Sequence, residues 1–116
     1  MPGMDSTPYP EKTCSIDRLV TRAEDVNLVL AGEKTAQRRN GLYAVPGERL
    51  ELGGVQFEVT RVYRQTLGEM TDEDARSEGQ ADRAAYIRYL DGIHPGIPWS
   101  PNIKMWVHEF RRLPSS

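Results

Sequence analysis

The sequence of 116 residues contains a single cysteine, Cys14, and few aromatic side chains (8%). A lone thiol can form no internal disulfide and supplies no cysteine-based metal site. Long apolar runs are absent too, and the first residues lack the charged, apolar and small-residue pattern of a secretory signal. We therefore expect a cytoplasmic protein without a membrane segment.

An excess of charge of one sign is also missing, because the net charge is -2 and the pI is about 5.7. A protein that coats duplex DNA needs a broad cationic face. We therefore expect no long duplex as a partner, whereas a local cationic pocket for a nucleoside, a nucleotide or an unpaired RNA base remains open. His94 and His108 lack partners at metal-ligand spacing, so we expect no metal and no cofactor.

A chain of this length builds one domain. We expect a flexible leader at 1–12, the packed domain at 13–113 and a tail at 114–116. The hydrophobic pattern predicts strands over 13–20, 48–52, 55–64 and 103–110, and helices over 21–31, 71–78 and 81–90. Short, hairpin-linked strands in this order favour an α+β fold, a small, mostly antiparallel β-barrel with helices covering its openings.

Two of the predicted helices begin with a possible capping residue. Thr21 and Glu24 have the spacing of a capping box, in which each side chain bonds to the other residue's amide. Thr71 is placed to cap the helix over 71–78, with acidic residues in its first turn. The strand over 55–64 alternates, so that Val55, Phe57, Val59, Arg61 and Tyr63 are expected to share one face.

The stretch 32–41 places three cations and a primary amide between two glycines, directly behind the first helix. Lysine supplies a point charge and arginine a planar fork, which suit an anion or a nucleobase. A solvated basic turn has the same composition, so that interpretation also stays open. Glu78 is the second unusual position, because the dipole disfavours an acid at a helix C-terminus. It needs a compensating cation or a functional reason.

These segments resemble the ASCH domain family, a PUA-like β-barrel related to RNA-binding modules. Residues 32–39 are similar to the family's G-x-K-T-x-x-x-R signature, 43–52 to its tyrosine and G-[DE]-x-[LIV] entry into the next strand, and 67–79 to its L-x-D-[LM]-T-x-E-D-A-x-x-E-G helix. The resemblance covers about 13–113. It implies a ligand pocket in which the Lys34 segment and the Glu78 helix face each other across the barrel mouth.

Some bacterial relatives in this family are amidohydrolases that remove the acetyl group from N4-acetylcytidine, using a lysine, a threonine three residues later, and the glutamate of the E-G pair. Lys34 and Glu78 match two of these positions, whereas Gln37 stands at the threonine position. A glutamine amide is not a nucleophile. The resemblance therefore leaves a route in which Lys34 and Glu78 activate water and Gln37 holds the acyl oxygen.

Arg38 and Arg39 point in opposite directions if the stretch is extended, so one of them lines the pocket more easily. We choose Arg39, which matches the family's arginine. Tyr43 is a candidate for stacking on a base, although a half-buried core position is the alternative. Trp99 stands between prolines on a loop and is expected to cover the pocket as a lid.

The leading hypothesis is a domain that binds a nucleoside, a nucleotide or a single-stranded RNA base. Its expected binding residues are Lys34, Gln37, Arg38, Arg39, Tyr43, Glu78 and Trp99. The alternative is an amidohydrolase acting on N4-acetylcytidine-type nucleosides, with Lys34 and Glu78 as the catalytic pair. A plain salt bridge between those two residues, and a protein-interaction adaptor without a small ligand, are the other possibilities.

Overall fold

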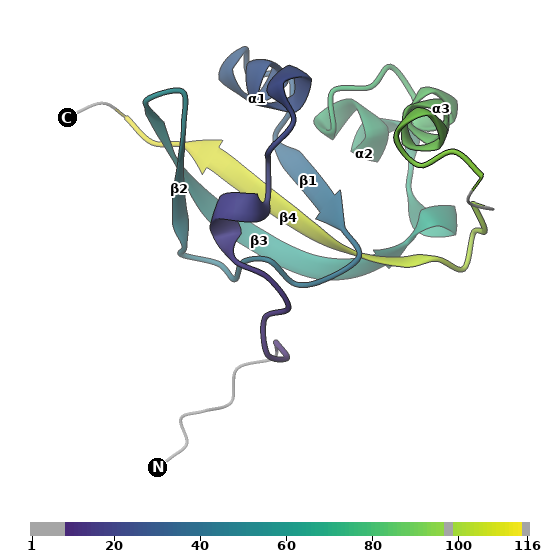
Figure 1. Ribbon diagram of the computed structural model, residues 1–116, viewed down its shortest axis with the longest axis horizontal. Helices are drawn as coiled ribbons and strands as arrows, with labels where there is room; N and C mark the ends of the chain where they lie inside the picture. The colour runs from purple at the N-terminus through teal and green to yellow at the C-terminus, as the bar shows by residue number, and fades with distance from the viewer. Residues whose placement is uncertain (1–8, 97–98, 115–116) are drawn as a thin grey trace.

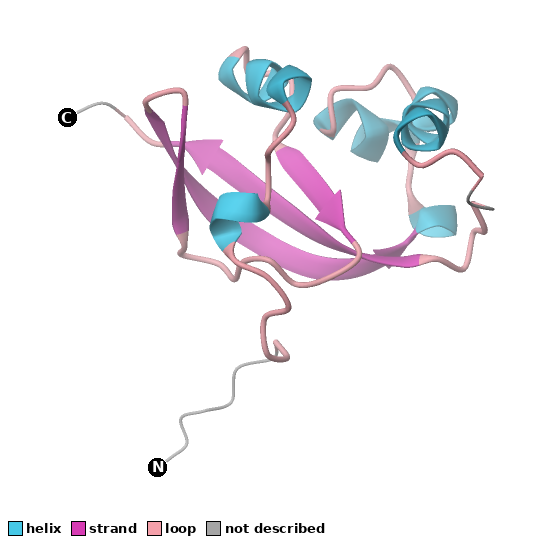
Figure 2. Cartoon of the chain, in the orientation of Figure 1, coloured by secondary structure: helices cyan, strands magenta, loops and turns pink. Residues whose placement is uncertain are grey.

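The structure, a computed structural model, describes residues 9–96 and 99–114 (Figure 1). Four strands form one antiparallel sheet in the order β1-β4-β3-β2, curled into a half-barrel. The strands are β1 (Ala36–Arg39), β2 (Arg49–Leu52), β3 (Val55–Thr66) and β4 (Lys104–Arg112), and the helices are α1 (Ala23–Leu30), α2 (Asp72–Ser77) and α3 (Arg83–Ile93). The three helices gather on the side of the sheet where β1 lies (Figure 2). This confirms the predicted α+β, mostly antiparallel architecture.

The hairpin of β2 and β3 is the element that the sequence predicted best. Leu52 pairs with Val55, and the turn between them uses Gly53 and Gly54 at φ values of 56° and 81°. Positive φ is the region that glycine enters without a steric penalty. The long β3 then pairs along most of its length with β4, which carries β1 on its other edge.

A bulge at Thr60 changes the face that β3 presents. Val59 pairs with Phe110 and Arg61 pairs with Glu109, so Thr60 is an extra residue outside the residue-to-residue pairing of β3 with β4. The alternation of side chains shifts by one position there. The prediction that Arg61 and Tyr63 share a face with Val59 is therefore wrong, and the buried residue beyond the bulge is Val62.

The predicted strand over 13–20 is also wrong. This segment contains a short 3-10 helix, η2 (Ile16–Arg18), preceded by a hydrogen bond from the Ser15 hydroxyl to the Asp17 carboxylate. Such local side-chain bonds compete with strand pairing. The free edge of β4 is instead occupied by β1, which lies inside the cationic stretch. Leu19 and Val20 are buried in the core, so their apolar character serves packing alone.

The first helix starts later than its proposed capping box. It begins at Ala23, and its N-cap residue Arg22 makes no side-chain capping bond, so the box of Thr21 and Glu24 is not formed. The second predicted cap is confirmed: Thr71 accepts from the amide of Asp74, whose carboxylate accepts from the amide of Thr71.

In the part of the chain that the structure describes, the core consists of three groups of buried side chains. The first lies between α1, η2 and the β2 end of the sheet and contains Leu19, Val20, Val29, Leu50, Leu52, Phe57 and Phe110. The second lies under the segment that follows β1 and contains Leu42, Ala44, Val59, Val62 and Trp106. The third lies between the β3–β4 end of the sheet and helices α2 and α3 and contains Leu67, Met70, Ala75, Tyr86 and Met105.

Parts of the predicted leader and tail lie outside the described residues, namely 1–8 and 115–116. The Tyr9 hydroxyl donates to the Val62 carbonyl at 3.2 Å, so contacts with the sheet begin before Thr13, where the domain was expected to start. Within the described ranges, none of the helices has the length and apolar character needed to cross a membrane. The cytoplasmic location stays a prediction.

The two threonines at helix starts allow a matched test of capping. Thr71→Ala removes a formed cap and should lower the free energy of unfolding by about 1 kcal/mol. Thr21→Ala removes a hydroxyl that caps nothing in α1, so its effect should be close to zero. Urea unfolding followed by circular dichroism measures both, and equal losses would contradict the two cap assignments.

Candidate functional site

Lys34 lies on the short segment between α1 and β1, and its backbone is fixed on two sides. Gly32 turns the chain at a φ of 81°, and the amides of Glu33 and Lys34 donate to the Leu28 carbonyl at 2.9 and 3.2 Å. The amide of Thr35 donates to the Ser77 carbonyl at 2.7 Å. These bonds hold the segment between α1 and α2 and place Lys34 directly opposite Glu78.

Glu78 is the C-cap residue of α2, and the chain turns immediately after it at Gly79. Gly79 has a φ of 86°, and a Cβ atom at this position would come within 2.9 Å of the Leu28 side chain. A larger residue would meet both backbone strain and this contact. The turn therefore packs closely against α1 and directs the Glu78 side chain toward β1.

Three charged side chains meet at the centre of the site, and we call them the ion cluster: Lys34, Arg38 and Glu78. The Lys34 ammonium lies 2.6 Å from Glu78 Oε1, and the Arg38 guanidinium lies 3.0 Å from Oε2. Each of the three side chains is only 1% exposed. Two cations thus compensate the acid at the helix end, which accounts for the unusual position of Glu78.

The ion cluster reaches the surface through Gln65 and Asp74. Arg38 donates from Nε and Nη2 to Gln65 Oε1 at 3.1 and 2.9 Å, and Gln65 donates to Asp74 Oδ2 at 3.1 Å. Burial opposes the charged form of Asp74, but bonds from the Thr71 amide and Gln65, together with the charge of Arg38, outweigh it and lower the pKa of Asp74. The Asp74 side chain is 26% exposed, so solvent reaches this end of the network.

Tyr63 and Glu109 lie beside this network on the same face of the sheet. The Tyr63 hydroxyl donates to Glu109 Oε2 at 3.2 Å, and the Arg61 guanidinium lies 4.3 Å from the centre of the Tyr63 ring. Burial and the charge of Glu109 raise the pKa of Tyr63. We call the half-exposed residues of this face the polar strip: Tyr63, Gln65, Asp74 and Glu109.

Arg39 does not join the ion cluster, so the choice of Arg39 over Arg38 is wrong. Successive residues of a strand face opposite sides, and Arg39 lies on the side away from Glu78. Its guanidinium donates to the Leu19 carbonyl at 2.8 and 3.1 Å and lies 5.3 Å from the centre of the Tyr43 ring. Arg39 and Tyr43 therefore connect β1 to the core segment before α1, and both lie away from the ion cluster.

Gln37 also lies on the face opposite the ion cluster. Its amide donates to the Arg38 carbonyl at 3.2 Å, and its buried Oε1 has no hydrogen-bond partner within the described part of the chain. The expected role of Gln37 as an oxyanion donor beside Lys34 is therefore wrong for this geometry. The neighbouring His108 is buried between the Gln37 carbonyl and the Tyr43 amide, at 3.1 Å from each, and burial lowers its pKa. This histidine fastens β1 to β4.

Trp99 packs at the edge of the core group formed by Leu67, Met70 and Met105, and its ring pairs with His94 at a centroid distance of 6.5 Å. It was expected to be a lid, and it contributes to the core beside α3 instead. In the described residues, no group of three histidine, cysteine, aspartate or glutamate side chains is arranged to hold a metal ion.

No protein-family model matches the chain, and no curated protein matches it in sequence. Solved structures do resemble it. An ASCH domain from Lactobacillus crispatus JV V101 superposes with a TM-score of 0.56 and 18% identity, covering 77% of this chain and 70% of that one. A DUF984 protein from Enterococcus faecalis V583 gives 0.57 and 17%, covering 76% and 66%. The chain has an ASCH-domain-like fold. At this level of identity the similarity concerns the fold alone.

Within this ASCH-domain-like fold, the polar strip is the part of the site that sequence reasoning missed. Asp74 was treated only as one of the acids in the first turn of the helix over 71–78, Tyr63 as part of a plain alternating strand over 55–64, and Gln65 fell outside that strand. Arg38 carried a usable signal, because Lys34 and Arg38 are an even number of residues apart and an extended chain puts such residues on one face. Nothing in the sequence marked the bulge that brings Gln65 to that same face.

The ion cluster should respond sharply to loss of its acid. Glu78→Gln leaves two buried cations without their counter-charge, so the free energy of unfolding should fall by about 3–5 kcal/mol. The matched control is Glu58→Gln, which breaks the exposed pair of Glu58 with Arg111 and should cost about 1 kcal/mol or less. Urea unfolding of both variants makes the comparison. Similar small losses of unfolding free energy in both variants would show that burial does not make the loss of Glu78's charge more costly.

Proposed function

We propose that the chain binds a nucleobase, as a nucleoside or as an unpaired base of RNA, at the polar strip above the ion cluster. The observation that carries this proposal is that buried Arg38 holds Gln65 by two hydrogen bonds, and Gln65 in turn holds Asp74. A surface amide and a surface carboxylate are thereby fixed side by side. Side chains oriented in advance by buried partners are what a selective polar site requires.

Counting the remaining hydrogen-bonding capacity indicates which ligand edge fits. A glutamine amide has two N–H donors, and Gln65 uses one of them on Asp74 Oδ2. Asp74 Oδ2 also accepts from the Thr71 amide, whereas Oδ1 faces Arg38 only at 3.8 Å. The pair therefore offers one donor beside one acceptor. Adjacent donor and acceptor groups also occur on the pairing edges of cytosine and adenine.

The charge balance favours a base over a phosphate. The cations of the ion cluster already face Glu78, and Asp74 adds a second negative charge beside Arg38. An incoming phosphate would meet both carboxylates, so a nucleotide should gain nothing over its nucleoside. The Arg61 guanidinium lies over the Tyr63 ring. If Arg61 moves aside, the ring supplies a flat surface on which a base can stack.

Calorimetric titration tests the proposal with cytidine, cytidine 5′-monophosphate, and a short unstructured RNA. Asp74→Asn replaces an acceptor at the base edge and should weaken cytidine binding about tenfold, the effect of one hydrogen bond to a charged group. Glu73→Gln, at an exposed position on the same helix, is the matched control and should bind as wild type does. Absence of binding by any of these ligands, or equal affinity in both variants, contradicts the proposal.

Hydrolysis of an acylated nucleoside is the second candidate, and the 2.6 Å contact of Lys34 with Glu78 favours it, because the pair is at proton-transfer distance. Two observations weigh against it. Both Glu78 oxygens already accept from cations, and Gln37 lies on the other face of β1. The Glu78 side chain is only 1% exposed, so it does not reach water until a substrate rearranges the cluster.

Incubation with N4-acetylcytidine separates the two candidates. The occupied and buried Glu78 carboxylate predicts no release of acetate above the level of a Lys34→Met control. Chromatography of the nucleoside measures the release. Release that disappears in both Lys34→Met and Glu78→Gln, while the circular dichroism of each variant stays native, would make the chain an amidohydrolase.

A further inference from the structure

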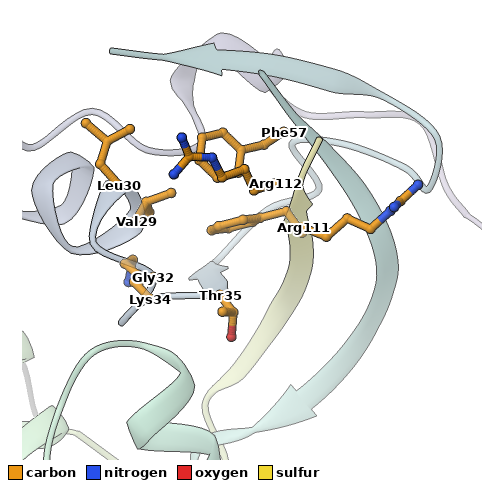
Figure 3. Close-up of a pocket in the computed structure, with 9 residues that line it drawn as sticks. Val29, Leu30, Gly32, Lys34, Thr35, Phe57, Arg111 and Arg112 are labelled. Atoms are coloured by element: carbon orange, nitrogen blue, oxygen red, sulfur yellow. The ribbon is translucent and has the colours of Figure 1, made fainter. Parts of the chain in front are cut away.

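A separate hollow of about 90 Å³ lies between α1 and the end of the sheet (Figure 3). Its apolar wall consists of Val29 and Leu30 from α1 and of Phe57 and Phe110 from β3 and β4, whose rings meet edge to face. Among the described residues, the lining includes Lys34 but neither Arg38 nor Glu78. The hollow is therefore distinct from the polar strip, and an inference about it is independent of the proposed function.

Two consecutive arginines at the end of β4 differ in how they face this hollow. Arg111 pairs with Glu58 at 3.1 Å, and Figure 3 shows its guanidinium directed away from the cavity. The Arg112 guanidinium instead lies over the cavity beside Leu30 and Phe57 (Figure 3). Within the described part of the chain it has no ion-pair partner. An apolar hollow is thus covered by an exposed cation that has no counter-charge among residues 9–96 and 99–114.

The end of α1 does not require Arg112 as a cap. The carbonyls of Leu28 and Val29 accept from the amides of Glu33, Lys34 and Gly32, so the turn after the helix satisfies them. The guanidinium therefore remains available for a ligand. An arginine fork above an apolar wall suits a carboxylate attached to a hydrocarbon group, because the fork binds the two oxygens and the wall takes the carbon atoms.

The volume limits the hydrocarbon part. An engineered apolar cavity of about 150 Å³ accommodates benzene, so a hollow of this size has room for about four carbons. We propose that it binds a small branched monocarboxylate, with an isobutyl-sized group against Phe57 and Phe110 and the carboxylate on Arg112.

Titration of the ¹⁵N-labelled protein by nuclear magnetic resonance tests this inference, with isovalerate as the probe. Isovaleramide keeps the hydrocarbon group without the charge, and acetate keeps the charge without the group. We expect isovalerate to shift the amides around the hollow, including Leu30, Phe57 and Phe110, with an affinity about tenfold above either analogue.

Two neighbouring variants provide the matched control. Arg112→Gln should weaken isovalerate binding about tenfold, whereas Arg111→Gln should leave it unchanged because Arg111 faces Glu58. Leu30→Trp should fill the hollow from its rim and abolish the shifts, with the native spectrum elsewhere retained. Equal weakening by the two arginine variants, or equal binding of acid and amide, overturns the inference. Tighter binding of glycyl-leucine than of isovalerate would also overturn it and reassign the site to a peptide end.

Discussion

The carboxylate of Glu78, held between the ammonium of Lys34 and the guanidinium of Arg38, is the contact on which the rest of the site depends. It joins the end of α2 to the start of the sheet in a region that water does not reach. Burying such a cluster brings little net stability, because desolvation of the charges offsets their attraction. Its structural effect is positional: the cluster holds Lys34 and β1 against the end of α2.

That fixed arrangement extends outward because Arg38 has more donors than Glu78 uses. The guanidinium presents five N–H groups in a plane: one on Nη1 binds Glu78, and one each on Nε and Nη2 bind Gln65. Gln65 reaches this position only because Thr60 is bulged out of the β3–β4 pairing, which moves the following residues to the other face. The same bulge brings Tyr63 beside Glu109. A buried charge and one extra residue in a strand together produce the polar strip.

The sequence, together with its resemblance to a known family, predicted the meeting of Lys34 with Glu78, although 44 positions separate them. The sequence did not predict which of the residues near this pair face it. Arg39 and Gln37 were assigned to the site, yet both lie on the face of β1 away from Glu78. Side chains alternate between the two faces of a strand, and Arg38, between them, is the residue that faces Glu78. The strand itself was missed: a run rich in cations is a poor strand signal, and its burial comes from partners that are distant in the sequence.

What the sequence determined by itself is local. The glycine turn between β2 and β3, the cap at Thr71 and the turn at Gly79 depend on neighbours within a few residues, whose preferences act in any context. Tertiary structure alone decided that 36–39 is a strand and which arginine is buried. Those outcomes depend on which segment pairs with the edge of β4 and on how deeply each charged side chain is buried. Both are set by segments that are distant in the sequence and meet only when the chain folds.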